Sequence, residues 1–149
     1  MSLFTPDLTQ HPPRSARCRL GGYVLLPRLL DKCRATILGK NGEYHYDCPL
    51  DQQFFGFIGL NADRLKDEVA RGGTDGEILT WINEHATFKR APWEVAQWTA
   101  FRETATPGEV ETRDFFNGIQ KNVGLLRDDI VTWHDLLDLD DYVSFGGKA

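Results

Sequence analysis

The sequence predicts a mainly α-helical protein, a compact bundle-like domain of five or six helices with at most one small β-hairpin. Apolar residues recur at intervals of three and four along most of the chain, which is the spacing of one helix face. Capping residues, first-turn prolines and glycines mark the ends of these segments. The composition is that of a globular protein, with 41% hydrophobic and 26% charged residues among 149. We expect residues 1–149 to form a single domain, with residues 1–20 as an extended basic arm packed on it.

The first expected helix covers residues 27–38 and begins at a proline, whose missing N–H costs nothing in a first turn. Its apolar residues share one face, and they are Leu29, Leu30, Cys33 and Ile37. The dipeptide Asn41-Gly42 follows and is the strongest short signal for a hairpin turn. We therefore expect any hairpin near residues 36–47, with residues 43–47 as its returning strand.

From residue 49 onward the pattern is helical, in short segments with recognisable boundaries. In chain order these boundaries are Gly59 as a stop, Asn61 as an N-cap, Gly72-Gly73 as a stop, Thr74 with Glu77 as a capping box, Pro92 as a first-turn proline and Thr106-Pro107-Gly108 as a turn. A further helix is expected around residues 116–123, and a last short one over residues 132–142. Short connections between such helices favour neighbours that pack side by side.

Positive charge is concentrated at the front of an otherwise acidic chain. Residues 1–40 carry seven of the 17 Lys and Arg and only two Asp, a net of +5, whereas the remainder has a net of −10. The overall charge of −5 argues against binding of nucleic acid or membranes by the whole surface. A basic segment with interleaved tyrosines suits single-stranded nucleic acid, but its acidic surroundings make that partner unlikely. We expect a local site for something negative.

The residues expected to form this anion site are Arg14, Arg17, Arg19, Arg28 and Lys32, with Tyr44 and Tyr46 lining it. Guanidinium forks suit phosphate and carboxylate, and Gly21-Gly22 allows a ligand to approach the backbone closely. A helix N-terminus at Arg28 and Lys32 adds N–H donors. The alternative interpretation is that these basic residues form salt bridges with the acidic remainder of the chain.

Residues 45–48 offer a weaker candidate for catalysis. His45 is a candidate acid or base, and Cys48 a candidate nucleophile. On a strand, however, His45 and Asp47 point to one face and Cys48 to the other. Cys48 also precedes Pro49, so a buried and inert thiol is favoured.

Neither metals nor cofactors are expected. Cys18, Cys33, Cys48 and His45 lack the usual spacing of zinc ligands. The acidic residues near the C-terminal end, Asp135, Asp138, Asp140 and Asp141, lack the glycine and glutamate of a calcium loop. We interpret them as a solvated acidic face of the last helix.

The cysteines and the apolar segments predict a cytoplasmic protein. The three cysteines are odd in number and contain no CxxC pair, which fits a reducing compartment. The first residues lack a charged segment followed by an apolar run. No stretch approaches the roughly 18 apolar residues that span a bilayer. The oligomeric state is left open.

A series of short motifs is similar to a known family. These motifs are Arg14-Ser15, Leu20-Gly21-Gly22-Tyr23, Pro27-Arg28, Asp31-Lys32, Arg34-Ala35, Gly42-Glu43-Tyr44-His45-Tyr46, Cys48-Pro49-Leu50-Asp51, residues 74–81, Thr132-Trp133 and residues 135–138. With them the chain resembles, over essentially its whole length, a bacterial domain-of-unknown-function family numbered 5069. The resemblance implies a small, stand-alone, mostly cytosolic domain, and it carries over no activity.

Three functions remain open. We favour a binding domain for an anionic small molecule or an acidic partner segment, held by the basic residues at the front of the chain. The first alternative is an enzyme acting on a phosphorylated or carboxylated substrate with His45 as acid or base. The second is a structural or protein-interaction role for the tryptophan-bearing helices. Whether the protein is an enzyme is not decided by the sequence.

Overall fold

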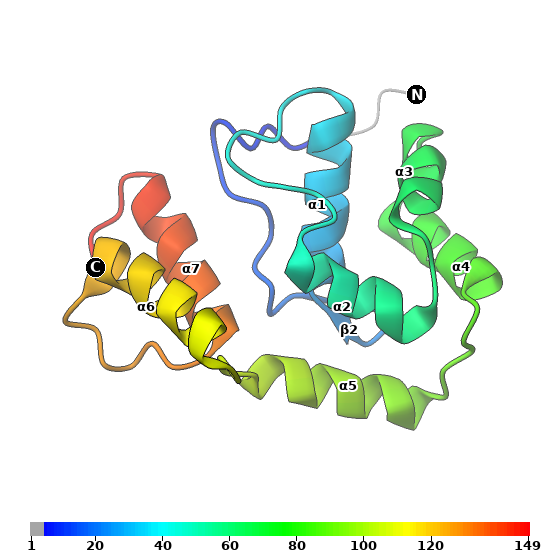
Figure 1. The fold of residues 1–149 in the computed structure, drawn as a ribbon. Helices are drawn as coiled ribbons and strands as arrows, with labels where there is room; N and C mark the ends of the chain where they lie inside the picture. The colour runs from blue at the N-terminus through cyan, green and yellow to red at the C-terminus, as the bar shows by residue number, and fades with distance from the viewer. Residues whose placement is uncertain (1–4) are drawn as a thin grey trace.

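The structure is a computed structural model that describes residues 5–149. In this part of the chain it contains seven helices and one two-stranded antiparallel hairpin (Figure 1). In chain order these are β1 (Arg19–Leu20), β2 (Tyr23–Val24), α1 (Leu26–Ile37), α2 (Pro49–Ile58), α3 (Ala62–Ala70), α4 (Asp75–His85), α5 (Pro92–Thr104), α6 (Val110–Gly124) and α7 (Trp133–Ser144). The mainly helical class is therefore confirmed, with seven helices where five or six were expected.

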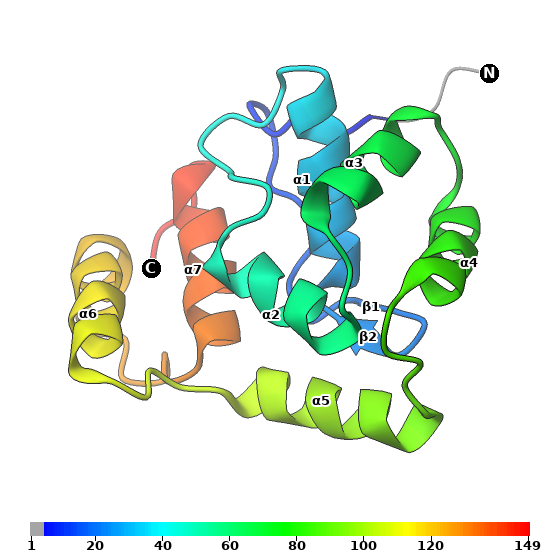
Figure 2. The same ribbon diagram turned by 45° about the vertical axis from the view of Figure 1, so that its right-hand side comes forward.

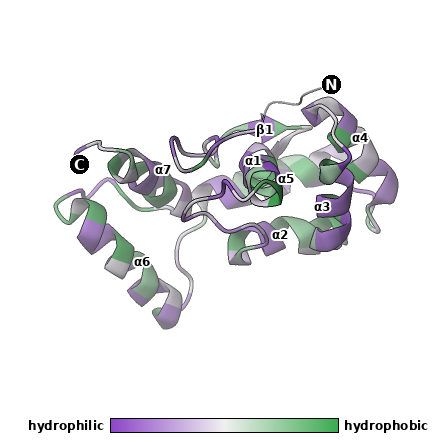
Figure 3. Cartoon of the chain, turned by 90° about the horizontal axis from the view of Figure 1, so that it is seen from above, coloured by the Kyte–Doolittle hydropathy of each residue, from purple (hydrophilic) through white to green (hydrophobic). Residues whose placement is uncertain are grey.

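Helix α1 lies near the middle of the molecule (Figures 1 and 2). Helices α3 and α4 lie to one side of it, α2 lies near its lower end, and α6 and α7 pack against each other on the other side. Helix α5 runs along one edge between these groups and contacts both β2 and α7. Seen from above, α6 lies out from the rest of the chain (Figure 3). None of the helices in residues 5–149 is long and apolar enough to cross a membrane.

Two apolar clusters correspond to this arrangement. In the larger one the buried face of α1 packs against residues of α2, α3, α4 and α5. Leu29, Leu30 and Cys33 of the predicted α1 face are fully buried, and Ile37 is partly buried. The smaller cluster joins α6 and α7 and contains only four buried residues, Phe116, Ile130, Leu136 and Leu139. Apolar burial therefore stabilises the first group of helices far more than the second.

Several helix ends lie where the sequence placed them. The Asn61 side chain accepts a hydrogen bond from the Arg64 N–H and caps α3. Thr74 and Glu77 form a reciprocal capping box at the start of α4. These bonds satisfy N–H groups that have no partner within the helix.

The hairpin is present, but its predicted position near residues 36–47 is wrong. The strands are β1 and β2, with Leu20 opposite Tyr23, and the two residues between them are Gly21 and Gly22. Their φ values of 59° and 84° are the left-handed values that a two-residue hairpin turn needs at both positions. The Gly-Gly pair was the correct signal, and Asn41-Gly42 was the misleading one.

The segment after α1 forms a loop because its backbone groups have other partners. The helix continues to Ile37, so no first strand precedes Asn41-Gly42. The Lys40 carbonyl accepts a hydrogen bond from the N–H of Leu8 at 2.8 Å. The Asn41 side-chain amide donates to the carbonyl of Tyr44, also at 2.8 Å. Part of the predicted arm, around the buried Leu8, therefore packs where the hairpin partner was expected.

Alanine substitutions at Gly42 and Gly39 test this contact between the loop and the arm. Both residues have positive φ, 54° and 66°, and alanine there is strained by about 1–2 kcal/mol. A Cβ at Gly39 meets nothing within 4 Å, whereas one at Gly42 lies 2.8 Å from the Leu8 carbonyl oxygen. We expect Gly42→Ala to lower the free energy of unfolding in urea by more than Gly39→Ala does. Equal losses would show that the arm does not pack on this loop.

Candidate functional site

The basic residues predicted to bind an anion are engaged with carboxylates of the chain itself. Arg14 donates from its Nε and Nη2 to the two oxygens of Asp31, at 3.0 and 2.9 Å. Its Nη1 reaches Asp75 at 2.8 Å, and Arg34 donates to the other oxygen of Asp75 at 2.7 Å. The arm, α1 and the start of α4 are thus held together by two arginines and two aspartates.

The next two arginines connect the front of the chain to its last helices. Arg17 binds Asp135 and also donates from Nε to Asp138 at 2.9 Å. Arg19, at the start of β1, pairs with Glu103 of α5 at 2.7 Å. The side chains of Arg17 and Arg19 are about half exposed, so each pair contributes only about 0–1 kcal/mol.

Arg28 forms a buried pair with Asp141. Its Nη1 and Nη2 donate to the two carboxylate oxygens at 2.7 and 3.2 Å, and only 4% and 9% of the two side chains are exposed. The Tyr44 hydroxyl donates to the same carboxylate at 2.8 Å, and the Arg28 guanidinium lies 5.4 Å from the Tyr44 ring centroid. This three-residue cluster joins α1, the following loop and α7.

Lys32 forms the second buried pair, with Asp51 of α2 at 2.8 Å. Its ammonium also donates to the carbonyl of His45 at 3.1 Å and lies 3.3 Å from the Cys48 Sγ. The His45 side chain is exposed. Tyr46, the last predicted site residue, donates its hydroxyl proton to the carbonyl of Ala62 at 2.7 Å.

These contacts correct the interpretation of the acidic residues of α7 as a solvated face. Asp135, Asp138 and Asp141 lie on one side of α7 and bind Arg17 and Arg28. The basic residues near the start of the chain therefore contact acidic residues near its end. The salt-bridge interpretation of the basic residues therefore describes the contacts seen, while anion binding by those residues stays a prediction.

The ion pairs also shift acid–base equilibria. Burial alone raises the pKa of Asp75, but hydrogen bonds from Arg14 and Arg34 outweigh it and hold that pKa below its ordinary value of 3.8. The unfolded chain then binds the proton more readily than the folded one. This contribution to stability is present at neutral pH and is lost as the pH falls from 3.8 through the lowered pKa.

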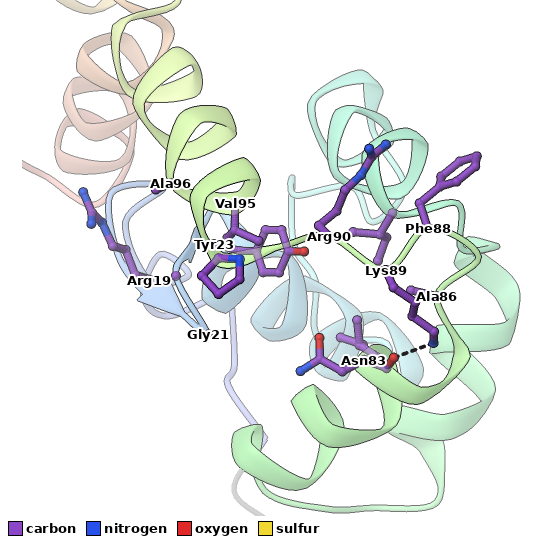
Figure 4. A pocket seen from close by; sticks show the side chains of 14 residues that line it. Arg19, Gly21, Tyr23, Asn83, Ala86, Phe88, Lys89, Arg90, Val95 and Ala96 are labelled. Carbon is purple, nitrogen blue, oxygen red and sulfur yellow. Dashed lines mark hydrogen bonds between the residues drawn. The ribbon is translucent and has the colours of Figure 1, made fainter.

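A different feature is a pocket lined by cationic side chains, which lies between the hairpin, α4 and α5 (Figure 4). Its volume is about 470 Å³. Its polar lining residues are Arg19, Tyr23, Asn83, Lys89 and Arg90. None of its lining residues, which all belong to residues 5–149, is an aspartate or glutamate. Of its three cations, Arg19 pairs with Glu103 at 2.7 Å and Arg90 with Glu94 at 3.5 Å. Lys89 is therefore the lining cation that has no carboxylate partner among residues 5–149.

The cations of this pocket are fixed by local contacts. The Lys89 ammonium donates to the carbonyls of Asn83 and Glu84 at 2.6 and 2.8 Å, which are groups at the end of α4. In Figure 4 its side chain extends toward the Asn83 carbonyl, to which the dashed line joins it. An ammonium has three N–H donors, so one remains. Arg90 stacks over Phe57 at 4.3 Å and donates from Nε to that residue's carbonyl at 3.0 Å.

A second pocket, of about 620 Å³, lies between the arm and the start of α4. Its charged lining residues include Arg14, Arg34, Asp31 and Asp75, which already form the paired cluster described above. Its charges therefore balance, unlike those of the first pocket. Across residues 5–149, no group of three or more His, Cys, Asp or Glu side chains is arranged to hold a metal ion.

The sequence analysis named only some of the residues that line the first pocket. Arg19 belonged to the predicted anion site, and Gly21 and Gly22 were noted beside it. Lys89 and Arg90 were missed. Their one signal was a pair of adjacent basic residues in a loop between two predicted helices.

The fold and these two features define a small, mainly helical domain with internal ion pairs between its ends and a cationic pocket at one side. The chain belongs to the family described as Domain of unknown function (DUF5069), whose model matches residues 10–143. The matched part contains both the ion pairs and the pocket. The family expected from the sequence motifs is therefore confirmed. Among curated proteins, no match to the chain is found.

Alanine substitutions of Arg28 and Arg19 separate a structural residue from an exposed one. Arg28→Ala leaves Asp141 buried without its cation, which typically costs about 3–5 kcal/mol. Arg19→Ala breaks an exposed pair and should cost about 0–1 kcal/mol. Urea unfolding of the two variants measures both values. A fully folded Arg28→Ala protein with wild-type stability would contradict the structural role of Arg28.

Proposed function

We propose that the protein is a cytoplasmic binding domain for an anionic small molecule, and that the ligand occupies the pocket between the hairpin, α4 and α5. The observation that carries this proposal is the lining of that pocket, which holds no carboxylate and includes Lys89, a cation with no carboxylate partner among residues 5–149. Of the residues first expected to bind the anion, Arg19 is the one that lines this pocket. Arg14, Arg17, Arg28 and Lys32 are paired with aspartates, and Arg19 itself is paired with Glu103.

The dimensions and walls of the pocket suit a small molecule better than an acidic protein segment. Its volume of about 470 Å³ lies in the range of small-ligand sites, about 300–1,000 Å³. The floor is apolar, with buried Ile58, Ile82 and Val95. Such a pocket covers the apolar part of a ligand while a few polar groups fix its orientation.

Lys89 is the cation best placed to meet the anion. The hydrogen bonds to the end of α4 hold its ammonium at the pocket, so little side-chain freedom is lost when a ligand binds. Arg19 and Arg90 add positive potential from the edges. A cleft of one sign of charge raises the local concentration of oppositely charged ligands.

The cytoplasmic setting is supported by Cys18, Cys33 and Cys48, which are all free thiols in the structure. A bacterial source is what the family resemblance implies. The enzyme alternative with His45 and the protein-interaction alternative stay predictions. His45 lines neither of the two pockets, so the pocket chemistry favours binding.

A thermal-shift screen of carboxylated and phosphorylated metabolites tests the proposal. A ligand at 100 times its Kd stabilises the folded state by about 2.7 kcal/mol, which raises the Tm by roughly 5–10 °C for a chain of this size. We expect the shift to shrink at high salt and in Lys89→Gln, because the ligand loses its cation.

The matched control is Lys121→Gln, which removes an exposed lysine on α6. Each shift is measured within one variant, with and without ligand, so that a change in basal stability does not affect it. Lys121→Gln should retain the full shift. Silence across the whole panel, or equal shifts in both lysine variants, would refute the proposed site.

A further inference from the structure

Arg102, in the last turn of α5, is a buried cation without a carboxylate partner. Only 8% of the residue is exposed. It forms no ion pair among residues 5–149, and its Nε is buried with no hydrogen-bond partner there. The guanidinium lies 5.6 Å from the ring centroid of Phe101, a contact that brings no negative charge. Burial lowers the pKa of Arg102 and no neighbouring carboxylate raises it again.

The carboxylates at this end of α5 and on the facing helix bind other arginines. Glu103 follows Arg102 in the chain and pairs with Arg19 at 2.7 Å. Asp138 of α7 accepts a hydrogen bond from Arg17 at 2.9 Å. A guanidinium keeps its charge in a protein, and a buried charge without a partner is costly. The unpaired Arg102 therefore indicates a negative partner from outside the chain.

A second unpaired polar group lies at the same junction of α5 and α7. The Trp133 N–H donates to the carbonyl of Ala105 at 3.1 Å, which joins the start of α7 to the C-cap of α5. His134 is the next residue and is 1% exposed. Its Nδ1 is buried and has no hydrogen-bond partner in the described part of the chain. Buried polar groups in folded proteins are almost always paired, so this junction has two polar groups that still need partners.

The charges that act on His134 come from the arm, α5 and α7. Burial is the main cause that lowers the pKa of His134, and Arg17 and Arg102 lower it further, whereas Asp138 and Glu103 raise it. The imidazole is therefore neutral at neutral pH and lies near enough to Arg102 to sense its charge. An anion beside Arg102 would favour the protonated imidazole and raise this pKa.

We propose that Arg102 binds a small inorganic anion, of the size of chloride or nitrate, at the junction of α5 and α7 beside His134. The near-complete burial of Arg102 favours a small ion over a protein side chain. Arg102 and His134 line neither of the two pockets, so this site is separate from the proposed metabolite pocket and does not depend on it. The anion neutralises Arg102 and holds the end of α5 against the start of α7.

Thermal unfolding in sodium chloride and in sodium gluconate of equal ionic strength tests the proposal, because gluconate is too large for so buried a site. At ten times its Kd, chloride should raise the ratio of folded to unfolded protein about elevenfold. This corresponds to a Tm increase of roughly 3–6 °C for a chain of this size. Sodium nitrate should act as chloride does. Equal Tm values in all three salts, as expected if only water fills the site, would overturn the proposal.

Two arginine variants assign the effect to this site. Arg102→Met removes the charge and keeps an unbranched side chain, so the gain in chloride over gluconate should be lost. In gluconate this variant should be at least as stable as the wild type, because it removes an unpaired buried charge. A clear loss of stability there would show that Arg102 already has a partner within the chain, and would overturn the proposal. Arg64→Met, at an exposed position of α3, should keep the full gain, and equal gains in both variants would also overturn it.

His134 provides a measurement on the unmodified protein. Replacing gluconate by chloride should raise the pKa of His134, followed by NMR of its ring protons, while the signals of the exposed His85 stay the same in both salts. An unchanged pKa of His134 would contradict an anion at this junction. The chloride effect should persist in Lys89→Gln, so failure of this site and failure of the metabolite pocket are told apart.

Discussion

The buried pair between Arg28 and Asp141 is the interaction on which the arrangement of the two ends of the chain depends. Arg28 belongs to α1, at the centre of the larger apolar cluster, and Asp141 belongs to α7. The smaller cluster of α6 and α7 contains only four buried apolar residues, so it has little apolar surface to offer the rest of the molecule. A paired charge at this position orients α7, since an unpaired one would be costly to bury.

Around this pair, exposed ion pairs fix the orientation of α7 more than they stabilise the fold. Arg17 reaches Asp135 and Asp138 on the same face of α7, about two turns and one turn before Asp141. Each exposed pair is weak by itself, but together they match the arm to one face of α7 only. A buried ion pair of this kind specifies geometry even where an apolar contact of equal volume would be as stable.

The pocket and the ion pairs are largely separate features. The buried pair joins α1 to α7, whereas the pocket lies between the hairpin, α4 and α5 (Figures 1 and 4). Arg19 takes part in both, since it pairs with Glu103 and lines the pocket. A ligand and a change in the ion pairs should therefore act on stability almost independently.

Much of the fold was predictable, because helix ends carry local chemistry: Asn61 and the pair Thr74 and Glu77 cap the helices that the sequence assigned to them. The hairpin was misplaced because two turn signals competed, and only contacts with Leu8, far away in sequence, decide against Asn41-Gly42. The charge separation was the right signal for the ion pairs, but a sequence does not show which carboxylate meets which arginine. Lys89 could not be assigned to a site, since its role depends on the packing of α4 against the hairpin.

A double-mutant cycle on Arg28 and Asp141 tests the central claim most directly. The free energies of unfolding of the wild type, Arg28→Ala, Asp141→Ala and the double variant give the coupling energy between the two side chains. Residues in direct contact couple by about 0.5–3 kcal/mol, and a buried bidentate pair is expected in the upper part of that range. Additivity of the two single substitutions, within about 0.3–0.5 kcal/mol, would show that this pair does not hold α7 against α1.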